Sequence, residues 1–219
     1  MPAVDPPRPY VTELRHITVS AGQPMWRVTP LEHLESLFRT DVVDVKGDGK
    51  AGGRFDPSSA CPYPYTYVAL DPLTAIAETM LRSVGYQAAG RLLHRAAYTG
   101  RAVSILEPTR ELSLISLLEP EHLSAARQDS WLVHAEPRQY PRTRRWGYWF
   151  RECSLRADGI IWPSKRHPHG KAMLLFGDPD RCGTALRRAP FGHRALDTED
   201  GEHWLAGLLR PLHTYLKDA

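Results

Sequence analysis

The stretch YTYVALDPLTAIAETMLRSV, residues 65–84, contains the clearest strand and the clearest helix signals of the sequence. Residues 65–70 are aromatic, β-branched or apolar, as in a buried strand. Asp71-Pro72 then places a capping residue before a proline at the first helical position. Apolar residues follow at the spacing of one helical stripe, namely Leu73, Ile76, Ala77, Met80, Leu81 and Val84. We therefore expect a strand that leads directly into a helix.

One acidic residue of this helix stands out by its position. At about 100° per residue, Glu78 falls about 60° beyond Leu81, on the shoulder of the apolar stripe. A carboxylate there points along the edge of the core. We expect Glu78 to face a cleft.

Short strands and helices alternate irregularly along the rest of the chain. Strands are expected at residues 24–28, 102–106, 112–117, 159–162 and 172–176. Helices are expected from Thr29-Pro30 to Phe38, over 121–133, within 140–156 and in the tail after Pro190, with residues 41–53 forming a loop. This mixture favours a single α+β domain over a doubly wound sheet.

Three regions are expected along the chain. Residues 1–24 form a loosely ordered, proline-rich arm, residues 25–180 the main domain, and residues 181–219 a helical extension that packs on the domain. A partner-binding or dimer-forming role for the tail helix remains the alternative, so a homo-oligomer stays open.

Composition narrows the class of protein. A chain of 219 residues that is 42% hydrophobic buries one sizeable core, and a formal charge of +3 is too small for a dedicated nucleic-acid surface. The three cysteines lie far apart, and no run of apolar residues is long enough to span a membrane. We expect a cytoplasmic protein without a membrane partner.

Three motifs have plain structural interpretations. The glycines at 47, 49 and 52 match a dinucleotide-binding fingerprint, but a strand-like segment follows them where that motif needs a helix. His167 and His169 have no acidic or cysteine partner at ligand spacing, so we expect no metal site. The basic aromatic run 138–151 has the composition of a helix with one buried face. Binding of single-stranded RNA or a partner protein remains its alternative.

Four blocks of the sequence resemble the RES domain, and together they extend over about residues 25–178. They are MWRV at 25–28, GGRFDP at 52–57, YVALDP with AIAE at 67–78, and DGIIWPS at 158–164. That family is named for an arginine, a glutamate and a serine, which match Arg54, Glu78 and Ser164. One departure is Phe55, where the family often has tryptophan.

The resemblance implies a fold related to ADP-ribosyltransferases and an activity that consumes NAD+. Family members are typically toxins that an Xre-like antitoxin neutralises, and their activities include NAD+ phosphorolysis and ADP-ribosylation. The family's functional arginines correspond to Arg27 and Arg54, and its tyrosine to Tyr67. The resemblance thus implies NAD+ as substrate, with inorganic phosphate as one candidate co-substrate, and we expect no metal.

The residue types suit this chemistry. Arginine forks bind phosphate oxygens bidentately, so Arg27 and Arg54 are expected on the pyrophosphate, and Tyr67 on the nicotinamide end. Nicotinamide leaves as a neutral molecule, so Glu78 alone suffices to stabilise the charge that develops on the ribose. Ser164 is expected to position the ribose or the nucleophile. The acceptor, whether phosphate, water or a protein side chain, stays open.

Overall fold

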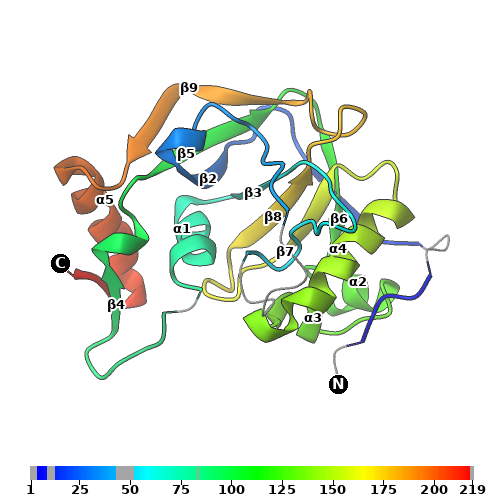
Figure 1. Ribbon diagram of the computed structural model, residues 1–219, viewed down its shortest axis with the longest axis horizontal. Helices are drawn as coiled ribbons and strands as arrows, with labels where there is room; N and C mark the ends of the chain where they lie inside the picture. Colours follow the sequence, from blue (N-terminus) through cyan, green and yellow to red (C-terminus); the bar gives the residue numbers. More distant parts are fainter. Residues whose placement is uncertain (1–3, 9–12, 43–51, 83, 218–219) are drawn as a thin grey trace.

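The computed structural model describes residues 4–8, 13–42, 52–82 and 84–217. One mixed sheet with the strand order β1-β6-β7-β8-β3-β2-β5-β9 forms its centre (Figure 1). Neighbouring strands are antiparallel except β6 and β7, which are parallel. The strands are β1 (His16–Val19), β2 (Met25–Pro30), β3 (Tyr65–Ala69), β5 (Arg101–Pro108), β6 (Leu112–Ser116), β7 (Gly159–Pro163), β8 (Lys171–Phe176) and β9 (Leu186–Ala195). A second, two-stranded parallel sheet joins β4 (Arg91–His94) and β10 (Thr214–Lys217).

The helices gather at the two ends of the sheet, with α1 between them (Figure 1). α2, α3 and α4 lie together at one end, and α5 lies beside β4 at the other. The helices are α1 (Pro72–Met80), α2 (Pro120–Ala125), α3 (Trp131–His134), α4 (Tyr140–Cys153) and α5 (Glu199–Leu209). Short 3-10 turns are η1 (Leu31–His33), η2 (Arg95–Ala97), η3 (Pro137–Gln139) and η4 (Arg210–Leu212). The expected α+β domain is confirmed.

The strand and helix predicted from residues 65–84 are β3 and α1. Asp71 caps α1 as predicted, because its carboxylate accepts hydrogen bonds from the Thr74 N–H and hydroxyl at 2.7 and 2.6 Å. The buried stripe of α1 includes Ile76, Ala77 and Met80. The helix ends at Met80, one turn before the predicted end.

The basic aromatic segment forms α4, and its rings face inward. Trp146, Trp149 and Phe150 are buried in one cluster with side chains of β7 and β8. The charged side chains Arg142 and Arg145 are exposed. These three buried rings are therefore not placed to stack on nucleic-acid bases.

The helix predicted from Thr29 to Phe38 is wrong. Residues 29 and 30 end β2, and only the 3-10 turn η1 follows. The leucine spacing fits a helix, but the carbonyls of Leu34, Ser36 and Leu37 turn inward and accept hydrogen bonds from Arg27. A buried side chain thus stabilises an open loop in place of a helix.

The single helix predicted over 121–133 is also wrong, since α2 and α3 are separate. Arg127 has a left-handed φ of 55°. The N–H of Arg127 bonds to the Ser124 carbonyl, and the N–H of Gln128 bonds to the Leu123 carbonyl. This is the Schellman arrangement that ends a helix, formed here without the usual glycine.

The terminal regions are more ordered than the sequence suggests. β1, within the predicted arm, pairs with β6 at one edge of the sheet. β9 pairs with β5 at the other edge, so the sheet continues past residue 180. The tail helix α5 packs on the domain's own core, where Leu205 and Leu209 belong to one buried cluster with Leu81 and Tyr98.

β2 and β3 diverge in the middle of the sheet, and this divergence positions the candidate site. Their register contains a single pair, Trp26 with Ala69. Four residues further back on β3, Arg39 replaces β2 as the partner of Tyr65, through hydrogen bonds of 2.8 and 2.9 Å. The chain that leaves β2 therefore loops outward before it returns to β3.

Within the described part of the chain, no helix has the length and apolar character needed to cross a bilayer. Of the glycine pattern at 47, 49 and 52, only Gly52 belongs to the described residues.

Candidate active site

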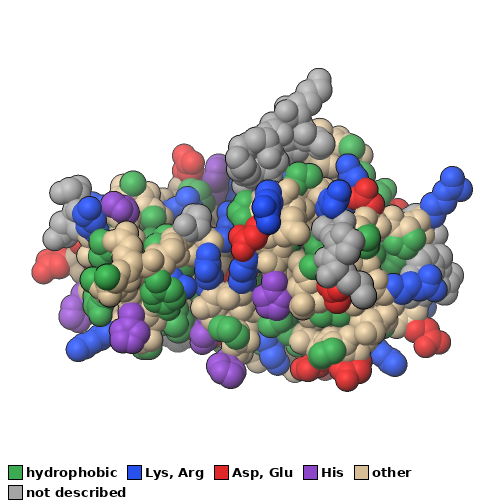
Figure 2. Space-filling view, turned by 90° about the horizontal axis from the view of Figure 1, so that it is seen from below, with side chains coloured by type: hydrophobic (Ala, Val, Ile, Leu, Met, Phe, Trp, Pro, Cys, Tyr) green, Lys and Arg blue, Asp and Glu red, His purple; other side chains and the backbone are tan. Residues whose placement is uncertain are grey.

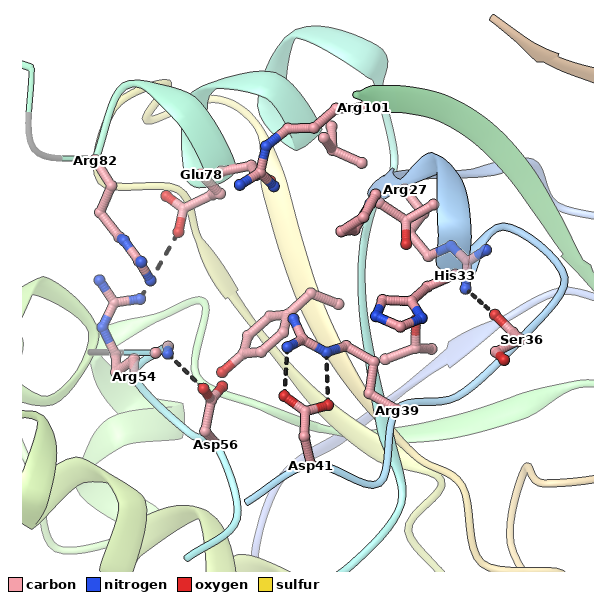
Figure 3. A pocket seen from close by; sticks show the side chains of 18 of the residues that line it. Arg27, His33, Ser36, Arg39, Asp41, Arg54, Asp56, Glu78, Arg82 and Arg101 are labelled. Carbon is pink, nitrogen blue, oxygen red and sulfur yellow. Dashed lines mark hydrogen bonds and ion pairs between the residues drawn. The ribbon is translucent and has the colours of Figure 1, made fainter. Parts of the chain in front are cut away.

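A cavity of about 580 Å³ lies where β2 and β3 diverge (Figure 3). It is lined by β2, β3, α1 and the turn at residues 52–56 that contains Arg54. Four of the five residues expected at the site, Arg27, Arg54, Tyr67 and Glu78, contribute to its wall. Ser164 lies behind the wall and is 1% exposed. The fold therefore brings together residues that are up to 137 positions apart in sequence.

Glu78 projects from the shoulder of α1 into the cavity, as its helical position predicts. One carboxylate oxygen, Oε1, accepts hydrogen bonds from the Ser164 hydroxyl at 2.7 Å and from the Lys165 N–H at 3.0 Å. The other oxygen, Oε2, lies 3.9 Å from the Arg54 Nη1. Because Oε1 is held from behind, the carboxylate has one orientation, and Oε2 faces the cavity.

Ser164 orients Glu78, and it is too deeply buried to reach a ligand in the cavity. Its hydroxyl donates to Glu78 and accepts from the His167 N–H at 3.2 Å. The predicted direct contact of Ser164 with ribose or nucleophile has no support in this arrangement. Ser164 is a positioning residue.

Two glycines precede Arg54, and each position requires glycine for a different structural reason. Gly52 has a left-handed φ of 79°, which side chains rarely adopt. A Cβ on Gly53 would lie 2.5 Å from both the Asp56 Oδ1 and the Tyr67 hydroxyl oxygen. Gly53 is therefore required by the packing of the turn.

The Arg54 guanidinium is buried and only partly satisfied. The residue is 4% exposed, and among the described residues its Nε has no hydrogen-bond partner. Its guanidinium carbon lies 6.0 Å from the centre of the Tyr140 ring and 5.9 Å from that of Trp162. The Thr143 hydroxyl of α4 bonds to the Arg54 carbonyl. A rigid, buried cation with an unused donor is suited to an anionic ligand.

Tyr67 presents its ring to the cavity and keeps its hydroxyl in the protein. The hydroxyl oxygen accepts a hydrogen bond from the Phe55 N–H at 3.0 Å. Burial, together with the nearby Asp56 carboxylate, raises the Tyr67 pKa well above its ordinary value. Tyr67 therefore stays neutral and offers a wall for an apolar or aromatic ligand group.

Arg27 lines the cavity, yet four of its five N–H donors bond to other groups of the protein. Nη1 donates to the Ser36 and Leu37 carbonyls at 2.6 and 3.1 Å, Nη2 to the Leu34 carbonyl at 3.2 Å, and Nε to the Ser104 hydroxyl at 3.4 Å. Burial, with a smaller effect of the Arg188 charge, lowers the Arg27 pKa to about 10. These contacts argue against the expected role of Arg27 as a direct phosphate ligand. They give Arg27 a structural role, in which it stabilises the loop at residues 34–37.

Replacing Arg27 with methionine should lower the free energy of unfolding by about 2 kcal/mol, because the carbonyls it holds lose their donors. Urea denaturation measures this change. The matched substitution Arg187→Met, at an exposed arginine of β9, should change stability by less than about 0.5 kcal/mol. Unchanged stability of Arg27→Met would return Arg27 to a role in ligand binding.

Two arginines that the sequence did not single out also line the cavity. Arg82 follows α1, and its guanidinium carbon lies 5.7 Å from the centre of the Tyr140 ring that Arg54 also faces. Arg101 begins β5. Figure 3 shows the two side chains reaching toward Glu78 from opposite sides. For Arg82 a sequence signal existed, since it follows Glu78 by four positions.

The cavity has an excess of positive charge. Five arginines but only three carboxylates are among its described lining residues, namely Arg27, Arg39, Arg54, Arg82 and Arg101 against Asp41, Asp56 and Glu78. Asp41 pairs with Arg39. In the space-filling view, several Lys and Arg side chains gather in the middle of the face seen from below (Figure 2). This charge balance favours an anionic ligand.

Comparison with known proteins gives one decisive match. A family model described as the RES domain matches residues 24–197, most of the chain. The chain belongs to the RES domain family. The matched region of this RES protein contains all five predicted site residues and both additional arginines.

Two further comparisons concern individual proteins. The RES protein is similar to a chain in the crystal structure of the M. tuberculosis MbcT–MbcA toxin–antitoxin complex, with 17% sequence identity and a TM-score of 0.47. The similarity covers 78% of this chain and 84% of that chain. Among curated proteins, none matches the sequence.

Proposed function

We propose that this RES protein cleaves NAD+ between nicotinamide and ribose, with inorganic phosphate as the acceptor. The observation that carries the proposal is the Glu78 carboxylate, which is oriented by Ser164 and the Lys165 N–H and faces a cavity with buried arginines. Membership in the RES family supports NAD+ as the substrate, since the resemblance implies an NAD+-consuming activity.

Arg54 and Arg82 are the proposed ligands of the NAD+ pyrophosphate. They lie against the same Tyr140 ring, and the Arg54 Nη1 lies 3.9 Å from the Glu78 Oε2 that faces the cavity. Two guanidinium groups that converge with one carboxylate nearby leave positive charge to be neutralised. A pyrophosphate carries the charge and the oxygens for two such forks. Arg82 thereby takes the place that the sequence suggested for Arg27.

Glu78 is the catalytic residue in this proposal, and its carboxylate acts on the ribose. The nicotinamide ring of NAD+ is cationic, so it departs as a neutral molecule and needs no general acid. Positive charge develops on the ribose as that bond lengthens, and a carboxylate fixed beside the sugar stabilises this charge more than it stabilises the ground state. Tyr67 lines the nicotinamide end with its ring.

The biological setting is proposed from the family. RES proteins are typically toxins, and this one would act in the cytoplasm under the control of an Xre-like antitoxin. Family membership supports this setting, because the matched domain extends over residues 24–197.

Product identification tests the proposal. The purified protein is incubated with NAD+, with and without inorganic phosphate, and the products are identified by mass. Nicotinamide together with ADP-ribose 1″-phosphate is the expected result. Free ADP-ribose would indicate water as the acceptor. A protein that carries an added ADP-ribosyl group would indicate ADP-ribosyl transfer. Intact NAD+ under every condition would overturn the proposal.

A further inference from the structure

Hydrogen bonds hold the backbone of Arg101 at the start of β5. Its N–H bonds to the Tyr98 carbonyl at 3.2 Å, and its carbonyl accepts from the Leu196 N–H at 2.9 Å. In the pairing of β5 with β2, Arg101 lies opposite Pro30. The half-buried side chain therefore enters the cavity from a fixed point of the sheet (Figure 3).

The Arg101 guanidinium differs from most other arginines of the cavity, because it has no interaction partner among the described residues. Arg27 bonds to carbonyls, Arg39 to Asp41, and Arg54 lies 3.9 Å from Glu78. Within the described part of the chain, no hydrogen bond, ion pair or ring contact engages the side chain of Arg101. All five of its N–H donors are thus available to a ligand.

The position of Arg101 separates it from the pair Arg54 and Arg82. Those two share the Tyr140 ring, whereas Arg101 approaches Glu78 from the opposite side, as Figure 3 shows. A pyrophosphate on Arg54 and Arg82 and a ribose at Glu78 would leave Arg101 next to the far side of the same sugar. A second anion held there would lie within reach of the anomeric carbon.

We propose that Arg101 binds the acceptor phosphate and selects phosphate over water. This inference rests on the proposed function. The bond between the anomeric carbon and the nicotinamide nitrogen breaks, and its electron pair goes to that nitrogen. A phosphate oxygen supplies the electron pair of the new carbon–oxygen bond. Nothing is oxidised or reduced, and NAD+ and phosphate are the only reactants.

The test is the phosphate dependence of the Arg101→Ala variant. We expect its KM for phosphate to rise about tenfold or more, since a charge-assisted contact is lost. The KM for NAD+ should stay within about twofold, and the products should shift from ADP-ribose 1″-phosphate toward ADP-ribose. Arg101→Lys keeps the charge but loses the fork, so its KM for phosphate should lie between those of the wild type and Arg101→Ala.

The matched control is Arg210→Ala, an exposed arginine after α5, which should leave both KM values unchanged. Thermal unfolding should show the Arg101→Ala protein to be as stable as the wild type, because among the described residues the Arg101 side chain makes no hydrogen bond or ion pair that the substitution would remove. An unchanged phosphate KM and an unchanged product ratio would overturn the inference.

Direct binding distinguishes failure of this inference from failure of the proposed function. A wild-type protein that never cleaves NAD+ would contradict the proposed function. Calorimetric titration with inorganic phosphate alone would then still test the site: binding to the wild type that is lost in Arg101→Ala supports an anion site at Arg101. Equal affinities, or no binding by either protein, would overturn it.

Discussion

The Glu78→Gln protein is expected to release nicotinamide from NAD+ about 100-fold or more slowly than the wild type. Glutamine keeps an oxygen that can accept from Ser164 and from the Lys165 N–H, so the side chain can retain its orientation. Its neutral amide cannot stabilise positive charge on the ribose. The loss should therefore appear in kcat, with a small change in KM for NAD+.

The measurement is nicotinamide release at saturating NAD+ and phosphate. The same substitution at Glu121, an exposed glutamate of α2, is the matched control and should leave the rate unchanged. If Glu78→Gln and Glu121→Gln turn over NAD+ equally fast, Glu78 has no catalytic role.

The Arg54→Lys substitution should weaken NAD+ binding by about 10- to 100-fold. Lysine preserves the charge, but it loses the planar fork that can bind two oxygens of a pyrophosphate. A hydrogen bond to a charged group contributes about 1.5–3 kcal/mol, and each 1.4 kcal/mol corresponds to about tenfold in affinity.

Calorimetric titration with NAD+ measures this effect, in a Glu78→Gln background that suppresses turnover. Arg187→Lys serves as the control, since lysine can keep the exposed ion pair of Arg187 with Glu107. Equal affinities of the Arg54→Lys and Arg187→Lys proteins would exclude Arg54 from the pyrophosphate site.

The central strands and α1 were predictable because their signals are local. β3, β5, β6, β7 and β8 are short apolar runs bounded by turn residues, and α1 has a capping residue, a proline and one apolar stripe. The same stripe placed Glu78 at the cavity. On a regular helix, the position of a side chain relative to the apolar stripe follows from its position in the sequence.

Edge strands were missed because their sequences do not require burial on both faces. β9 contains Pro190 and Gly192, which are typical of a loop, and its register with β5 shifts between Ser104 and Leu106. β1 is short and mostly exposed or half-buried. Pairing with a neighbouring strand decides these elements, and that pairing is not local.

Roles within the site depended on contacts between distant residues. Ser164 and Glu78 are 86 positions apart, so nothing in the sequence alone showed that the serine faces the glutamate rather than a ligand. Arg27 is of a residue type that binds phosphate, but in the fold it donates hydrogen bonds to the carbonyls of the 34–37 loop. Residue types indicated the chemistry, and only the fold assigned each residue to it.

The most direct test of this account is a crystal structure of the Glu78→Gln protein with NAD+. The predicted result places the pyrophosphate on the guanidinium groups of Arg54 and Arg82 and the nicotinamide ribose beside residue 78. Arg27 should still bond to the carbonyls of Leu34, Ser36 and Leu37. NAD+ bound away from this cavity, or a pyrophosphate held by Arg27, would contradict the account.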